Sequence, residues 1–301
     1  MKKFKIILAS LFLTMSFTSC IDDIEIETQE GPQLVGINGY ISNEYKKHQI
    51  TISKTLDFYS TDEIEMISGA EVYVHDGSDT IYFKETDNKG CYETIDSIAG
   101  VIGKTYNLNV NFFDDEGEHY YYAQSTMREN VQQIDSIVIN NVTLNGETLD
   151  NVYGLYPYFQ SSTDPNTNYL VNIGINDSLT SNSLIKCTSY SMAGLSGLYV
   201  NGPEFVSLVG NLPAYIFPMV GSFSEDGSFV YEISLEEGDK VSMYLYSITP
   251  EFAKYIADIN SNFGSNPMMG MPYNVSTNIY PIGKAVGFFE AYSIVEASII
   301  Y

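Results

Sequence analysis

The stretch YNLNVNF, residues 106–112, decides the fold class of this chain. Its first, third, fifth and seventh residues are Tyr, Leu, Val and Phe, and the three residues between them are asparagines. Successive side chains of a β-strand point to opposite faces, so the apolar residues share one face and the asparagines share the other. The pattern therefore predicts a strand with one face in a core and one face in water, which is typical of antiparallel sheets.

Short segments of the same kind surround this strand. SGAEVYV at 68–74 alternates in the same way, DNKG at 87–90 predicts a hairpin turn, and DDEGE at 114–118 predicts another turn. Closely spaced strands and turn signals indicate a sandwich or a barrel. The segments SGAEVYV, GCYET and GKTYNLNV also resemble, in this order, the transthyretin-like carboxypeptidase-regulatory modules. We therefore predict an Ig/transthyretin-like β-sandwich over residues 33–127.

The second block, residues 128–301, is predicted to be a larger antiparallel β-domain, sandwich or barrel-like, so the chain is all-β. Strands are expected at about 168–176, 183–191, 204–209, 228–235 and 240–248. One amphipathic helix is expected at about 250–262, within TPEFAKYIADINSNFG. Thr249 is a typical N-cap and Pro250 suits the first helical position. Apolar residues then recur at helical spacing, so this helix is expected to pack on a sheet.

The N-terminus predicts export from the cytoplasm. Residues 1–19 hold three lysines and then an apolar stretch, Ile6–Phe17, which as a helix is too short to cross a bilayer and indicates a signal peptide. Thr18 and Ser19 precede Cys20 as in a bacterial lipobox. We therefore expect the Cys20 thiol to be acylated, with palmitate a typical chain, and to become the new N-terminus. An ordinary cleaved signal followed by a chance cysteine is the alternative.

Four acids follow the cysteine in an acidic tether at residues 20–32: Asp22, Asp23, Glu25 and Glu27. In one interpretation they form only a solvated, flexible linker. In the other they are an export signal, because they resemble the acidic signal that directs lipoproteins of Bacteroidetes to the outer face of the outer membrane. The second interpretation predicts a lipid-anchored protein of the outer membrane that faces the cell exterior.

Composition excludes some partners. The chain has 38 acidic and 14 basic residues, and loss of residues 1–19 would bring the net charge to about −27. Such a field repels nucleic acid, and the single arginine, Arg128, rules out an arginine-rich phosphate clamp. Tyrosine is abundant at 25 residues, which is typical of recognition surfaces, whereas the absence of Trp counts against a sugar-stacking platform.

No catalytic residue, cofactor or metal site is predicted. The three histidines, His48, His75 and His119, lack the spacing of zinc ligands, and DDEGE lacks the spacing of a calcium loop. Cys91 and Cys187 fall in different predicted blocks and are expected to be unpaired, although a disulfide is chemically permitted outside the cytoplasm.

The segment NPMMGMPY, residues 266–273, is predicted to be a loop. Methionine adapts to irregular surfaces, so Met268, Met269 and Met271 form a candidate partner-contact loop. Packing of this loop onto the protein's own core is one alternative, and binding of Cu(I) by the thioethers is another.

Several pieces together resemble one family. They are the lipobox and acidic tether, LVGINGYIS, SGAEVYV, QIDSI, GDKVSMYLYSITPEFAKYI and PYNVSTNI ahead of GFFEAYS. In this order they resemble the Bacteroidetes outer-membrane lipoprotein family filed as domain of unknown function 4249. The resemblance implies a surface lipoprotein that accompanies a TonB-dependent transporter, and it brings no catalytic residue with it.

We therefore expect a non-enzymatic surface lipoprotein that is an accessory or ligand-capture partner of a TonB-dependent transporter. An adhesive, fimbria-like structural protein is one alternative. Lipidated fimbrillins mature by cleavage at a basic residue after the lipobox. The first arginine of this chain, Arg128, lies deep in the sequence, which counts against this alternative. An extracellular hydrolase is the second alternative, since many carboxylates are available.

Overall fold

The computed structural model describes residues 32–56, 60–115, 117–129, 133–144, 147–159, 166–181, 183–184, 188–191, 206–207, 215–217, 235–264 and 275–301. Gln33–Tyr301 form one compact unit. The predicted signal peptide, Cys20 and the acidic tether up to residue 31 lie outside the described residues.

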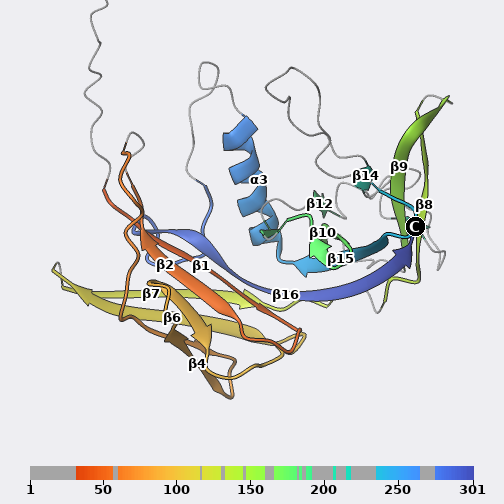
Figure 1. The fold of residues 1–301 in the computed structure, drawn as a ribbon. Helices are drawn as coiled ribbons and strands as arrows, with labels where there is room; N and C mark the ends of the chain where they lie inside the picture. Colours follow the sequence, from red (N-terminus) through yellow and green to blue (C-terminus); the bar gives the residue numbers. More distant parts are fainter. Residues whose placement is uncertain are drawn as a thin grey trace, which may run out of the picture. The chain divides into compact units, whose positions relative to one another are not determined.

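Within the described residues, the main sheet has 12 strands in mixed orientation (Figure 1). Their order is β11 (Ser178–Leu179), β10 (Asn168–Ile175), β15 (Lys240–Ile248), β16 (Ala285–Ile300), β1 (Val35–Ser42), β2 (Gln49–Lys54), β5 (Cys91–Thr94), β4 (Thr80–Glu85), β3 (Glu71–His75), β6 (Thr105–Asp114) and β7 (Gly117–Thr126), while β12 (Thr188–Ser191) pairs with β10. The predicted all-β class is confirmed.

The first seven strands enclose one hydrophobic core with part of β16. The alternation in β6 appears as predicted: Tyr106, Leu108, Val110 and Phe112 are buried, while the asparagines between them are half-buried on the other face. Both predicted hairpins are confirmed. β4 pairs with β5 across residues 86–90, and β6 pairs with β7 beyond Asp114.

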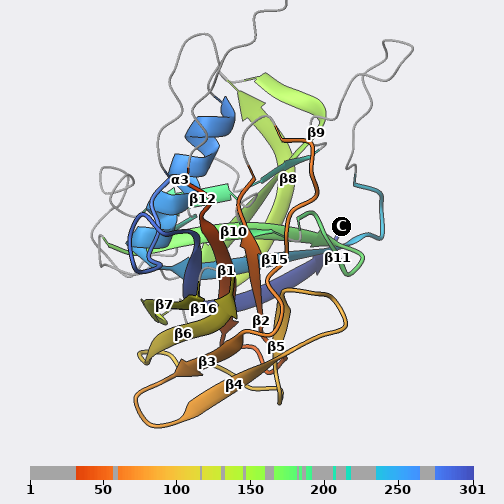
Figure 2. The ribbon, with the colours of Figure 1, turned by 90° about the vertical axis from the view of Figure 1, so that its left-hand side faces the viewer.

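Strand β16 joins the two predicted blocks in one sheet (Figure 2). Its first half, from Ala285 to Tyr292, pairs in parallel with β1, and its second half pairs antiparallel with β15. Gly287 permits the close approach of β16 to β1. Its φ is +96°, and a Cβ at this position would lie 2.1 Å from the carbonyl oxygen of Ile37.

Strands β10 and β15 are covered on both faces by apolar side chains. On one face, the helix α3 (Pro250–Gly264), drawn in blue in Figure 1, packs Phe252, Tyr255 and Ile256 against residues of these two strands and of the first half of β16. On the other face, Val241, Met243 and Leu245 pack with residues of a small second sheet. That sheet consists of β8 (Ser136–Leu144), β9 (Glu147–Phe159), β13 (Val206–Ser207) and β14 (Tyr215–Phe217).

The predicted helix and most predicted strands of the second block are present. The helix begins at Pro250 as expected and ends at Gly264, slightly beyond the predicted end. The Oγ1 of Thr249 accepts a hydrogen bond from the Phe252 amide at 3.2 Å, which is the predicted N-cap. Strands β10, β12, β13 and β15 fall within the expected ranges, while residues 228–234 lie outside the described part of the chain.

Candidate functional site

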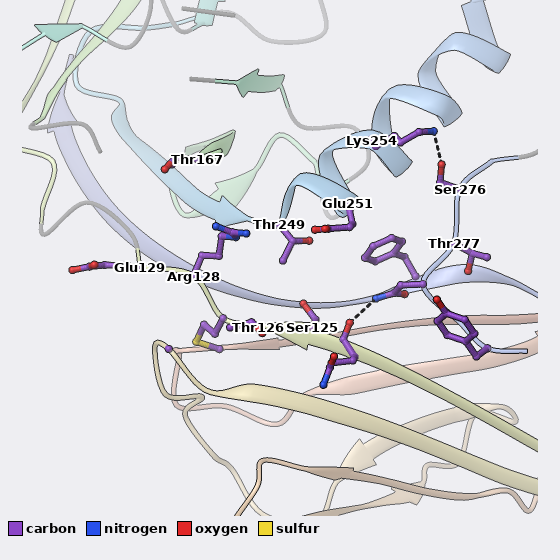
Figure 3. A pocket seen from close by; sticks show the side chains of 16 residues that line it. Ser125, Thr126, Arg128, Glu129, Thr167, Thr249, Glu251, Lys254, Ser276 and Thr277 are labelled. Carbon is purple, nitrogen blue, oxygen red and sulfur yellow. Dashed lines mark hydrogen bonds between the residues drawn. The ribbon is translucent and has the colours of Figure 1, made fainter. Parts of the chain in front are cut away.

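An open cavity of about 860 Å³ lies where the end of β7 meets the N-terminus of α3 and the segment 276–280 (Figure 3). Its lining includes residues 124–129, Thr249, Glu251, Lys254 and residues 276–278. Hydroxyl, amide and charged side chains dominate this lining, and Met127, Tyr280 and Phe288 supply apolar surface. Ligand sites have this combination of concave shape, apolar area and a few convergent polar groups.

A buried carboxyl group fixes two walls of the cavity to each other. Glu290 of β16 is fully buried, and its Oε1 accepts a hydrogen bond from the Thr249 amide at 2.6 Å. Its Oε2 accepts bonds from the hydroxyls of Thr249 at 2.8 Å and Ser125 at 3.0 Å. Ser125 and Thr249 both line the cavity, so this carboxyl ties the end of β7 to the start of α3.

Burial raises the pKa of Glu290 to about 8, because desolvation disfavours the ionised form. The hydrogen bonds from Thr249 and Ser125 oppose this shift. Glu290 is not one of the lining residues, and its side chain is inaccessible to a ligand. We therefore assign it a structural role in holding the cavity wall.

The third wall, the segment 276–280, is held by its own contacts. Asp258 of α3 accepts hydrogen bonds from the amide and the hydroxyl of Ser276 and from Lys254 Nζ at 2.7 Å. These contacts, led by Lys254, lower the pKa of Asp258 to about 2. Asn278 donates to the carbonyl oxygens of Gln124 at 3.1 Å and Phe289 at 2.7 Å. The segment is thereby connected to α3, β7 and β16.

The backbone at 128–129 forms the remaining side of the cavity. The hydroxyl of Ser293 donates to the Arg128 carbonyl at 2.8 Å, and that of Ser247 donates to the Glu129 carbonyl at 3.0 Å. Arg128 and Lys254 bring positive charge to the cavity, and Glu129 and Glu251 bring negative charge. The arrangement suits a polar ligand that carries both hydrogen-bond donors and acceptors.

None of the three histidines, which the sequence did not assign to any site, is in the lining of this cavity. His48 is buried, which lowers its pKa, and its Nε2 lies 3.1 Å from the carbonyl oxygen of Ile98. His75 ends β3 and accepts from the Gly77 amide at 2.9 Å, and His119 contacts Asp114 at 2.7 Å beside the predicted hairpin. Within the described ranges, no group of three His, Cys, Asp or Glu side chains could hold a metal ion.

Several predicted site residues lie outside the described residues: Cys20, the export-signal acids Asp22, Asp23, Glu25 and Glu27, the loop residues Met268, Met269 and Met271, and Cys187. Cys91 is described and has a free thiol. In the part of the chain that the structure covers, no helix has the length and apolarity that a membrane span needs.

Sequence reasoning missed the residues that build the cavity. One signal was available: Glu290 stands alone within the apolar run GFFEAYS. A charged residue inside a buried strand requires partners, so its position indicates a polar network. Its partners Ser125 and Thr249 come from distant segments, and nothing in the sequence around them indicates that they bond to Glu290.

A comparison with protein-family models finds that the model described as "Domain of unknown function (DUF4249)" matches residues 21–298. A comparison with curated proteins finds no match.

Proposed function

The chain belongs to the DUF4249 family, and we propose that it is a non-enzymatic lipoprotein of the outer-membrane surface that captures a ligand for a TonB-dependent transporter. The observation that carries this proposal is the open, polar cavity of about 860 Å³, whose size is within the range of small-molecule sites. Hydrogen bonds of buried residues hold its walls, so a ligand would meet a preformed site.

The N-terminal sequence supports the location. An acylated Cys20 would anchor the chain by lipid, and the residues between Cys20 and Gln33 would separate the compact unit from the membrane. Protease treatment of intact cells tests the orientation. The protein should be degraded, and a variant in which Asp22, Asp23, Glu25 and Glu27 are changed to alanine should be protected. Protection of the unaltered protein would contradict display on the cell exterior.

Recovery of a tagged chain from outer membranes in mild detergent tests the transporter partner. We expect a TonB-dependent transporter to be recovered in comparable amount. A matched variant with Met268, Met269 and Met271 changed to serine should recover less transporter, because the candidate partner-contact loop would lose its apolar surface. Recovery of the lipoprotein without any transporter would refute the partnership.

An extracellular hydrolase is the second candidate, and one observation favours it. Two carboxylates, Glu129 and Glu251, line the same cavity, and glycoside hydrolases use a pair of carboxylates on either side of the scissile bond. Turnover of a polysaccharide that is abolished in both Glu129→Gln and Glu251→Gln would establish this activity and displace the first proposal. No turnover, or turnover unaffected by either change, would remove the second candidate.

A further inference from the structure

Four tyrosines and one asparagine form a straight row across the outer face of the main sheet, opposite the hydrophobic core. The strand register places Tyr82 beside Tyr73, Tyr73 beside Asn109, and Asn109 beside Tyr122. An isolated bridge then places Tyr122 beside Tyr280. We call these five residues the tyrosine row. At about 4.8 Å between neighbouring strands, the row is roughly 19 Å long.

The rings of the tyrosine row are accessible. Tyr82, Tyr122 and Tyr280 are 54%, 47% and 44% exposed, which leaves ring surface available to a ligand. The rings of Tyr122 and Tyr280 stack with centroids 5.1 Å apart and planes 11° apart, and those of Tyr73 and Tyr82 lie 6.0 Å apart. The stacking limits the freedom of these side chains before any ligand binds.

Neutral polar groups flank the row on the same face. Tyr120 donates its hydroxyl to Asn109 Oδ1 at 2.6 Å, and Gln124 donates to Asn107 Oδ1 at 3.0 Å. Carboxamides combine donors and acceptors, so they can pair with hydroxyl groups in either direction.

Charged side chains of this face lie to one side of the row. The register places Glu71 and Lys84 next to the row on that side, and Glu93 and Glu118 farther out. The five residues of the row itself are uncharged, although the chain is strongly acidic. A ligand that follows the row would therefore lie mainly on neutral groups.

The dimensions argue against a protein partner. The row and its neighbours on either side cover roughly 300–400 Å², given the strand spacing and rise. A stable protein interface needs about 800 Å² from each partner. An exposed aromatic patch of this smaller size is often functional. A long, thin ligand that follows the row would use the available surface more fully than a globular protein would.

We propose that the tyrosine row binds a neutral polysaccharide, laid across the strands with its sugar rings packed on the exposed ring surface of the tyrosines. The C–H face of a pyranose is apolar and packs on the aromatic surface that the stacked rings leave exposed, while its hydroxyls pair with carboxamides and phenol hydroxyls. A neutral polymer also avoids the repulsion that an acidic polymer would meet from this chain. The absence of Trp counted against such a platform, but the register supplies the ring area by aligning four tyrosines.

This site is separate from the proposed ligand capture. Of the five residues in the row, Tyr280 alone lines the cavity. Binding of a polysaccharide by the row would require neither the cavity nor a transporter.

Native electrophoresis through gels that contain laminarin, galactomannan or arabinoxylan, all neutral, tests the proposal. The sample is residues 20–301 with Cys20→Ser, which prevents acylation. We expect retardation in at least one of these gels and none with polygalacturonate, which is acidic. Tyr82→Ala and Tyr122→Ala should each weaken the interaction about tenfold, while Tyr82→Phe should retain it because the ring remains.

Two matched variants complete the design. Tyr45→Ala removes a tyrosine that is 79% exposed but lies outside the row, and it should bind normally. Glu251→Trp, on the first turn of α3, fills part of the cavity and should also bind normally. Normal mobility in all three neutral gels would overturn the proposal. Retardation in polygalacturonate alone, or retardation lost in Glu251→Trp but kept in Tyr82→Ala and Tyr122→Ala, would also overturn it.

Discussion

Between pH 5 and pH 8, the stability of the unaltered chain should fall relative to that of a variant in which Glu290 is replaced by glutamine. The pKa of Glu290 is about 8 in the folded protein, against 4.5 for a glutamate in the unfolded chain. Between these values the unfolded chain has lost the proton that the folded protein still binds. The free energy of unfolding therefore falls as the pH rises, by about 1.4 kcal/mol per pH unit.

The whole effect is about 5 kcal/mol, of which about 4 kcal/mol appears between pH 5 and pH 8. A glutamine at this position does not titrate, so the variant lacks this slope. The amide carbonyl of the glutamine can accept from the Thr249 amide, and its NH₂ can donate to the hydroxyls of Thr249 and Ser125 after they rotate. The variant should therefore keep the fold and the cavity wall.

Urea unfolding of residues 20–301 with Cys20→Ser, at pH 5, 6.5 and 8, measures the difference. Other acids titrate equally in both proteins, so subtraction isolates Glu290. Glu296→Gln, at an exposed position of the same strand, is the control and should run parallel to the unaltered protein. A difference between the Glu290→Gln variant and the unaltered protein that stays constant within about 1 kcal/mol across this range would refute the argument.

Three further predictions concern the elements around the cavity, each measured by urea unfolding. Gly287→Ala should lower the free energy of unfolding by more than about 3 kcal/mol, because the φ of Gly287 is +96° and a Cβ there would lie 2.1 Å from the carbonyl oxygen of Ile37. Gly283→Ala, where a Cβ would meet open space, should lower it by only about 1–2 kcal/mol, and equal losses would contradict the β1–β16 packing. Thr249→Val should lower the free energy of unfolding by about 2–3 kcal/mol, because it removes both the N-cap and the hydroxyl bond to Glu290. Ser261→Ala, on the exposed surface of the helix, should change it by less than about 0.5 kcal/mol, and similar values for the two variants would contradict the cap. Asp258→Asn should lower the free energy of unfolding by about 1–2 kcal/mol at pH 7 and by almost nothing at pH 2. The pKa of Asp258 is lowered from 3.8 to about 2, so the stability that its charge contributes is lost as the pH falls through this range. A loss that does not depend on pH would show that the charge is unimportant.

The sequence predicted those parts of the fold that depend on local pattern. Alternation identified β6, turn residues identified the hairpins on either side of it, and Thr249-Pro250 identified the start of α3. Each of these signals lies within a dozen residues, where side-chain direction and capping chemistry act directly.

Long-range pairing was not predictable in the same way. β1 and β16 are parallel neighbours although about 250 residues separate them, and a single sequence carries no mark of that partnership. The two predicted β-rich blocks therefore share one sheet. Nor does the sequence indicate that Tyr73, Tyr82, Tyr122 and Tyr280 stand in one row, because the row depends on the register between strands.

In the cavity, too, the sequence indicated local features but not contacts between distant segments. Thr249 was predicted as a helix cap, but its second role, donating to Glu290, requires β16 to pass beneath the helix start. Ser125 reaches the same carboxyl from β7. Three segments that are distant in the sequence thus hold two walls of the cavity together, and only the isolated glutamate in GFFEAYS indicated that a polar network was needed.

Native mass spectrometry of the protein released from its own outer membrane tests the central claim, that the cavity captures a ligand, most directly. We predict a bound small molecule on the unaltered protein and on Tyr45→Ala, and its loss from Glu251→Trp, whose indole would occupy the cavity. A protein that carries no ligand, or a ligand that remains bound in Glu251→Trp, would contradict the claim.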